Sequence, residues 1–423
     1  DQTGSDLIYF TAVSTEGSWP PVVTLTLVFV AVAAVLMGPA IMVAECFFEL
    51  PRLDAYRYDL LGSLAGTVSF AVLSYVGAGP VVWSLVIAAL VLALVGGSRL
   101  TTKGIAVVAL GVVVYSMSVG VLREGDIWSP YYKIEVINQV ATDKAGTQTP
   151  AYAVIANGVP HQAILDLDFR LEGEPFYAQP YERIAEGPVG DVLVVGAGNG
   201  SDVALALRQG ATSVDAVEID PRIKQLGAEL HPQKPYDDPR VTPYIGDGRA
   251  FLHTTDKKYD LVIFALPDSL TLVAGSNQLR LESYLFTQEA LEDVKAVLKP
   301  GGAFAMYNYY RENWLIGRLA NTAEAAFGHA PCVDAFRARS AVIVAGLTEA
   351  DQRCGDPAVD ASVVSDLSGP PPVHDERPFL YLKDASIPGT FLLVIVMVLL
   401  VSLIAVRVIG GPLRRMAPYA DLA

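Results

Sequence analysis

Long apolar segments lie at both ends of the chain. They are Pro21–Ala44, Leu60–Val76, Val81–Val95, Ile105–Leu122 and Phe391–Ile409. Among them they contain a single charged residue, Arg407. A helix needs about 20 mostly apolar residues to cross the hydrocarbon core of a bilayer. A buried soluble helix would explain one such segment but not five, so the pattern predicts five membrane-spanning helices.

The middle of the chain has a different pattern, in which short apolar runs end in glycine and acidic residues. Asp191–Val195 runs into a Gly-x-Gly-x-Gly turn at positions 196–200, and a helical pattern follows at 202–209. A second apolar run, Val214–Asp220, contains Glu218 near its end. This order of strand, glycine turn, helix, strand and acid is typical of nucleoside-binding folds. The glycines let backbone approach the ligand, and the acid can bind two ribose hydroxyls.

Further strands are predicted at Val241–Ile245, Tyr259–Phe264, Ala303–Tyr307 and Ala341–Leu347, with a helix at Gln288–Leu298. Strands that alternate with helices predict a parallel sheet. Ligands of such sheets bind beyond the carboxyl ends of the strands. Glu218, Asp247 and Asp268 all fall at such ends.

Composition and charge support this division of the chain. Hydrophobic residues make up 52% of the sequence and charged residues 18%, against about 25% charged in soluble domains. That composition excludes both a single soluble globule and a disordered chain. Residues 123–386 carry 23 Lys and Arg but 37 Asp and Glu, a net charge of −14. Nucleic acid is excluded as a partner, because its binding depends on basic contacts to phosphate.

The motifs between Asp191 and Gly302 together resemble the spermidine synthase (aminopropyltransferase) family and, more loosely, class I methyltransferases. Ile155–Gln162 resembles the small β domain that precedes the nucleotide-binding sheet in that family. Tyr236–Val241 and Gly246–Leu252 resemble its adenine-binding stretch. The run Arg377–Leu382 before an apolar helix resembles the membrane-embedded branch of the family. Members of that branch often have more helices, so further helices are expected outside this sequence.

The resemblance implies a multi-pass membrane protein with a Rossmann-like α/β domain of the spermidine synthase and methyltransferase type. The expected parts are a membrane domain at 1–122 with four spanning helices, a small β domain at 123–187, the nucleoside-binding domain at 188–350, a linker at 351–386, and a last spanning helix with its tail at 387–423.

The resemblance also implies the ligands and the site. The alkyl donor would be S-adenosylmethionine or its decarboxylated form, leaving S-adenosylhomocysteine or methylthioadenosine, with no metal. Its expected contacts are Gly196, Gly198, Asn199, Gly200, Glu218, Asp247 and Gly248. The expected acceptor pocket contains His161, Gln162, Tyr177 and Ala265.

Two positions depart from the family pattern. The acid of the glycine turn is Asn199 here, and the first of two acids after the fourth strand is Ala265, so that Asp268 remains as the expected catalytic base. An amine must be neutral to attack, and a positioned base helps to remove its proton. The nucleoside half of the site therefore reads as complete and the polyamine half as incomplete, which predicts weak or absent synthesis of ordinary polyamines.

Three functions remain open from the sequence. The first is a membrane-bound transferase that moves an aminopropyl-type alkyl group to an amine or membrane-associated acceptor. The second is an S-adenosylmethionine-dependent methyltransferase, in which Asn199 would face a donor carboxylate. The third is a non-catalytic nucleoside-binding sensor or transport-related protein. The expected partners are a lipid bilayer and a small-molecule or lipid acceptor, with a homodimer left open.

Two arguments about membrane orientation disagree. Seven Lys and Arg lie near the membrane on one side and four on the side of the acidic domain, which weakly places that domain outside the cytoplasm. Because S-adenosylmethionine is held inside cells, we nevertheless expect the domain in the cytoplasm. Cys46, Cys332 and Cys354 do not form a disulfide framework or zinc site. We expect unpaired thiols, whereas a Cys332–Cys354 disulfide would indicate the opposite side.

Overall fold

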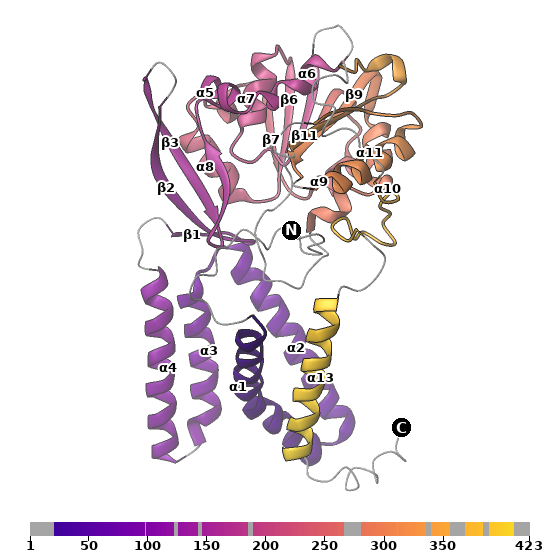
Figure 1. Ribbon diagram of the computed structural model, residues 1–423. Helices are drawn as coiled ribbons and strands as arrows, with labels where there is room; N and C mark the ends of the chain where they lie inside the picture. Colours follow the sequence, from indigo (N-terminus) through magenta and orange to yellow (C-terminus); the bar gives the residue numbers. More distant parts are fainter. Residues whose placement is uncertain are drawn as a thin grey trace. The chain divides into compact units, whose positions relative to one another are not determined.

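The computed structural model describes residues 21–97, 99–121, 126–142, 146–184, 189–265, 281–310, 312–335, 340–355, 369–383 and 389–409 (Figure 1). The chain forms two compact units, which we describe separately. One comprises residues 1–69 and 384–423, and the other residues 70–383.

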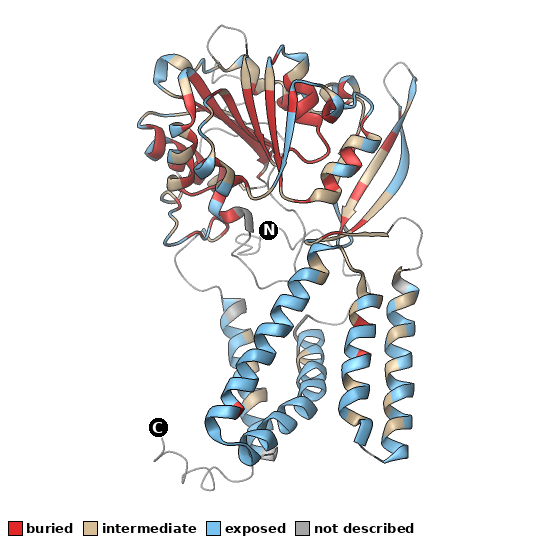
Figure 2. Cartoon of the chain, turned by 180° about the vertical axis from the view of Figure 1, so that it is seen from behind, coloured by how far each residue is buried: buried red, intermediate tan, exposed pale blue. Residues whose placement is uncertain are grey.

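Helices form at each of the five predicted segments. They are α1 (Pro21–Glu49), α2 (Arg52–Tyr75), α3 (Pro80–Leu94), α4 (Leu100–Val121) and α13 (Gly389–Ile409). Within the first unit, the Thr26 hydroxyl of α1 donates to the sulfur of Met397 in α13, at 2.8 Å. Three helical segments, Val23–Glu49, Pro80–Gly97 and Leu100–Val119, are long and apolar enough to cross a membrane by length and composition, and Leu392–Arg407 is a shorter apolar helix. Most of their side chains are exposed (Figure 2), as lipid-facing residues would be.

The second unit contains a small antiparallel sheet in the order β1-β2-β3-β4. Its strands are β1 (Asp126–Trp128), β2 (Lys133–Thr142), β3 (Gln148–Ala156) and β4 (Val159–Ile164). The indole of Trp128 lies 6.4 Å from that of Trp83 in α3, edge to face. The helices α5 (Leu167–Gly173) and α6 (Gln179–Glu182), with a 3-10 turn at Pro175–Tyr177, follow this sheet.

A seven-stranded sheet in the order β10-β11-β9-β8-β5-β6-β7 forms the core of this unit. Its strands are β5 (Asp191–Val195), β6 (Ser213–Glu218), β7 (Val241–Ile245), β8 (Tyr259–Ala265), β9 (Leu298–Tyr309), β10 (Cys332–Ala335) and β11 (Ser340–Gly346). The helices between them are α7 (Ser201–Arg208), α8 (Pro221–Leu230), α9 (Gly248–Thr254), α10 (Gln288–Ala296) and α11 (Asn313–Phe327). The central strands are almost wholly buried (Figure 2).

The prediction of a purely parallel sheet is wrong, because the sheet is mixed. β5 to β9 run parallel, but β11 pairs antiparallel with both β9 and β10. Only four residues separate β10 from β11, whereas a parallel crossover needs a dozen or more. The strand predicted at Ala303–Tyr307 is also longer in the structure, since β9 begins at Leu298.

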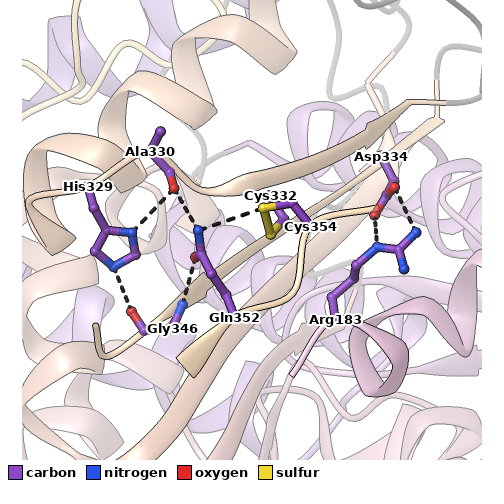
Figure 3. Close-up of a disulfide and its surroundings, with 8 residues drawn as sticks. All are labelled: Arg183, His329, Ala330, Cys332, Asp334, Gly346, Gln352 and Cys354. Atoms are coloured by element: carbon purple, nitrogen blue, oxygen red, sulfur yellow. Dashed lines mark hydrogen bonds and ion pairs between the residues drawn. A yellow bond between two sulfur atoms is a disulfide. The ribbon is translucent and has the colours of Figure 1, made fainter. Parts of the chain in front are cut away.

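The expectation of unpaired thiols is also wrong for two of the three cysteines, because Cys332 and Cys354 form a disulfide (Figure 3). After β11 the chain turns at Glu349–Asp351 and runs back towards the start of β10. The Gln352 side chain donates to the Ala330 carbonyl at 2.8 Å, and this return path brings the two cysteines together. Cys46, in α1, is free and exposed.

Candidate functional site

The glycine turn between β5 and α7 has the backbone that its sequence requires. Gly196, Gly198 and Gly200 have φ values of 78°, 54° and 93°, a region that other residues adopt only with strain. A Cβ added at Gly198 would lie 2.7 Å from the side-chain nitrogen of Gln162. The turn therefore needs glycine both for its conformation and for the approach of the small sheet.

Glu218, at the end of β6, accepts a hydrogen bond from the backbone of this turn. One carboxylate oxygen accepts from the Gly198 N–H at 2.8 Å and the other from the Asp220 N–H at 2.9 Å. Burial raises the pKa of Glu218 to about 7, against the effect of these backbone hydrogen bonds. Glu218 thus has a structural role in the turn, and its contact with ribose stays a prediction.

Asp247 and Gly248 lie at the carboxyl end of β7, where α9 begins. The Asp247 carboxylate accepts from the Ala250 N–H at 2.9 Å and so caps α9. A Cβ at Gly248 would lie 2.4 Å from a methyl of Val195, so this glycine lets α9 pack on β5. The adenine contact expected at Asp247 stays a prediction.

Sequence reasoning missed Tyr131, which lies between β1 and β2. Its pKa is raised by burial and then by the negative charges of Asp220, Asp247 and Glu218. The phenol therefore lies within electrostatic reach of the acids at the strand ends. The only signal in the sequence was a pair of tyrosines in a short polar linker.

Asn199 and Gln162 join the glycine turn to the small sheet. The Gln162 side-chain oxygen accepts from the Asn199 backbone N–H at 3.0 Å. The Asn199 side-chain amide donates to the Ala163 carbonyl at 3.1 Å, and its oxygen accepts from the Ser201 hydroxyl at 2.7 Å. A carboxylate at position 199 would face the Ala163 carbonyl without a proton to donate, which explains asparagine there.

The expected acceptor residues lie around one cavity of about 450 Å³ between the two sheets. Its lining comprises Ala153, Pro160, His161, Gln162, Ala163, Leu165, Phe169, Arg170, Gly173, Glu174, Tyr177, Gly196, Asn199, Ser201, Asp202, Ala265, Asn308 and Tyr309. His161, Gln162, Tyr177 and Ala265 therefore lie around the same cavity, and their contact with an acceptor stays a prediction. Asp268 lies outside the described residues, and its role as a base stays a prediction.

A partly buried ion pair that the sequence did not predict forms one wall of the cavity. The Arg170 guanidinium donates to Glu174 at 2.6 Å and to the Tyr177 phenol at 3.1 Å. Tyr309 donates to the other Glu174 oxygen at 2.6 Å. The ion pair itself is local, four residues apart, but the contact from Tyr309 in β9 forms only in the folded chain.

Two further polar groups line the cavity. Burial lowers the pKa of His161 to about 4, so its ring is neutral near pH 7, and its Nδ1 is buried without a hydrogen-bond partner in the described structure. Asp202, in the first turn of α7, accepts a hydrogen bond from the Tyr307 phenol. Sequence reasoning treated Asp202 as an ordinary helical residue, although it is the only charge among the buried positions Ser201–Ala206.

Part of this chain is similar to known proteins. Residues 185–333 match the family described as "Spermine/spermidine synthase domain". The polyamine aminopropyltransferase of Sulfolobus acidocaldarius is 33% identical over 117 residues, covering 26% of this chain and 36% of the relative. That of Escherichia fergusonii is 31% identical over 129 residues, covering 30% and 42%.

A solved structure titled "Crystal Structure of Spermidine Synthase in Complex with Transition State Analogue AdoDATO" is also similar. It has 14% sequence identity and a TM-score of 0.38, and the match covers 62% of this chain and 87% of that chain. The two curated relatives, by contrast, are matched over only 36% and 42% of their own length, so the chain spans less than half of each. The family match and these relatives support a transferase. The family match lies outside the apolar helices, so the predicted membrane-embedded branch stays a prediction.

Proposed function

We propose that this protein is a membrane-bound transferase of the spermidine synthase type. It would transfer an aminopropyl-type alkyl group from decarboxylated S-adenosylmethionine to an amine. The observation that carries the proposal is the glycine turn, which Glu218 holds through the Gly198 N–H at 2.8 Å and which borders the 450 Å³ cavity. The turn would bind the nucleoside, and the cavity would bind the acceptor beside it.

The donor would lie over Gly196–Gly200, between Glu218 and Asp247, and would supply an activated carbon next to a sulfonium. The residues of this chain would mainly position the two reactants, which can lower a barrier substantially without further chemistry. The five apolar helices favour an acceptor that partitions into the membrane, and we propose a lipid-like or amphiphilic amine.

A methyltransferase is the second candidate, and one observation weakens it. In a methyltransferase, the side chain of Asn199 would face the carboxylate of S-adenosylmethionine. The Asn199 side chain instead bonds to Ala163 and Ser201, so that its amide is already occupied within the chain.

Turnover by the purified full chain in detergent tests the proposal. The protein would be given either donor with putrescine, spermidine or dodecylamine, and the nucleoside product identified by chromatography. We expect methylthioadenosine from the decarboxylated donor with at least one amine. S-adenosylhomocysteine from undecarboxylated donor would instead establish the methyltransferase. Binding of methylthioadenosine without any turnover would favour the non-catalytic sensor.

The membrane side of the α/β unit is a separate proposal. The intracellular supply of S-adenosylmethionine favours the cytoplasm. The Cys332–Cys354 disulfide now joins the Lys and Arg distribution in favouring the other side, because disulfides persist mainly in oxidising compartments. We therefore propose the non-cytoplasmic side, where the donor would also have to be supplied.

A further inference from the structure

We propose that Asp202 binds the acceptor amine and takes its proton, replacing the acids that the spermidine synthase pattern would have at positions 199 and 265. This inference rests on the proposed function and names a residue of the same site. It assigns a catalytic role to a side chain that the motif comparison passes over.

Asp202 lies in the cavity where the missing acids would be. It lines the acceptor cavity together with Asn199 and Ala265, the two positions where an acid is missing. It follows Asn199 by three residues, so that both side chains come from the junction of the glycine turn and α7. The carboxylate that is absent at position 199 is thus present a single helical turn further along, at Asp202.

The other acids near the cavity are already committed. Glu174 pairs with Arg170 at 2.6 Å and accepts from Tyr309 at 2.6 Å. Glu218 accepts from two backbone N–H groups of the nucleoside half. Asp202 accepts from the Tyr307 phenol, and within the described part of the chain it has no ion-pair partner.

Charge in the cavity favours a cation. Arg170 and Glu174 cancel, and His161 is neutral near pH 7 because burial lowers its pKa. When it is ionised, Asp202 then supplies the net negative charge of the lining. Burial also raises the pKa of Asp202 to about 7, close to the value that makes a general base effective at neutral pH.

The proposed step balances as follows. The acceptor nitrogen forms a bond to the carbon next to the donor sulfonium, and the carbon–sulfur bond breaks with its electron pair left on sulfur. The nitrogen loses one proton, which passes to a carboxylate oxygen of Asp202. The nucleoside product is a neutral thioether, and water can later remove the proton from the carboxyl group.

Asp202→Asn tests the inference, because asparagine keeps an oxygen that can accept from Tyr307 but cannot take a proton. Asp215→Asn is a matched control: Asp215 is also buried and also accepts from a tyrosine, Tyr259, at 2.7 Å, but it does not line the cavity. Both full-length variants would be purified in detergent and their methylthioadenosine affinity measured by calorimetry. They would then be assayed with decarboxylated donor and the three amines.

We expect Asp202→Asn to keep its affinity for methylthioadenosine and to lose about 10²–10⁴-fold in kcat, the usual contribution of general acid–base catalysis. Asp215→Asn should keep its activity. We also expect Tyr307→Phe to move the acid limb of the pH–rate profile to higher pH, because the Tyr307 hydrogen bond favours the charged carboxylate.

Equal kcat in Asp202→Asn and Asp215→Asn would overturn the inference and leave the proposed transferase standing. Amine turnover absent from the wild-type protein, together with no calorimetric binding of the amines in the presence of methylthioadenosine, would overturn both. The methylthioadenosine titration would then report whether the nucleoside half of the site exists by itself.

Discussion

The side-chain amide of Asn199 donates a hydrogen bond of 3.1 Å to the carbonyl of Ala163. This contact joins the glycine turn of the seven-stranded sheet to β4 of the small sheet, at the edge of the cavity of about 450 Å³. Arg170 donates to the same carbonyl. The carbonyl of Ala163 thus receives two donors, one of them from the asparagine at position 199.

Asn199→Asp should destabilise the protein instead of restoring a family-like site. The carboxylate cannot donate to Ala163, and a typical intramolecular hydrogen bond contributes about 0.5–1.5 kcal/mol to stability. A lower Tm of the purified protein, measured by fluorescence, would confirm this. The control is Asn157→Asp, since the Asn157 side-chain oxygen accepts from the Lys133 N–H at 3.0 Å and aspartate keeps that role. Equal Tm values for the two variants would contradict the structural account of Asn199.

Glu218→Ala should weaken binding of methylthioadenosine by about 1.5–3 kcal/mol, because a charged hydrogen-bond acceptor is lost. The glycine turn also loses its contact at the Gly198 N–H, which acts in the same direction. Calorimetry with the purified protein measures the change. Glu229→Ala, at an exposed position of α8, is the control and should bind as the wild type does. Unchanged affinity in Glu218→Ala would remove this residue from the nucleoside site.

The sequence predicted what depends on local pattern. The five apolar segments form helices, and the Gly-x-Gly-x-Gly turn lies between β5 and α7 as expected. His161, Gln162, Tyr177 and Ala265 line one cavity. Local pattern could not group them; they were grouped because the chain resembles a family whose members bring these segments together.

What the sequence could not predict depends on contacts between distant segments. Asp202 looked like an ordinary helical residue, since only the packing of α7 buries it beside Tyr307. The strand β11 was predicted, but its antiparallel direction was missed, because its apolar run is the same in either direction. Cys332 and Cys354 are 22 residues apart, and only the turn after β11 brings them together.

The buried imidazole of His161 should make the stability of the protein depend on pH. Burial lowers its pKa to about 4 in the folded protein, against about 6.5 in an unfolded chain. Between these values the unfolded chain binds a proton that the folded protein does not. The contribution of His161 to stability is therefore lost as the pH falls from about 6.5 to about 4.

His161→Gln removes this term, so the Tm of the variant relative to wild type should rise as the pH is lowered through that window. Parallel thermal unfolding curves between pH 4 and 7 measure the difference. His253→Gln is the control, because the side chain of His253 is 55% exposed. A His161→Gln difference that does not vary with pH would show that the ring is solvated.

The disulfide between Cys332 and Cys354 should be present in growing cells and should stabilise the α/β unit. Closing a loop of this length contributes about 2–4 kcal/mol, so the double variant Cys332→Ala, Cys354→Ala should unfold at lower temperature. Peptide mapping of alkylated membranes without reductant should recover the two cysteines in one linked pair. Two separately alkylated peptides would show that the thiols are free in the cell.

Thiol labelling can determine on which side of the membrane the α/β unit lies. In a Cys46→Ala background, a cysteine introduced at the exposed position Glu229 should react with a membrane-impermeant maleimide on intact cells. Cells permeabilised before labelling give the maximum signal and serve as the control. We expect equal labelling in both, because seven basic residues against four and the disulfide favour the non-cytoplasmic side. Labelling only after permeabilisation would place the unit in the cytoplasm with the donor. The Cys332–Cys354 disulfide would then form only under oxidising conditions.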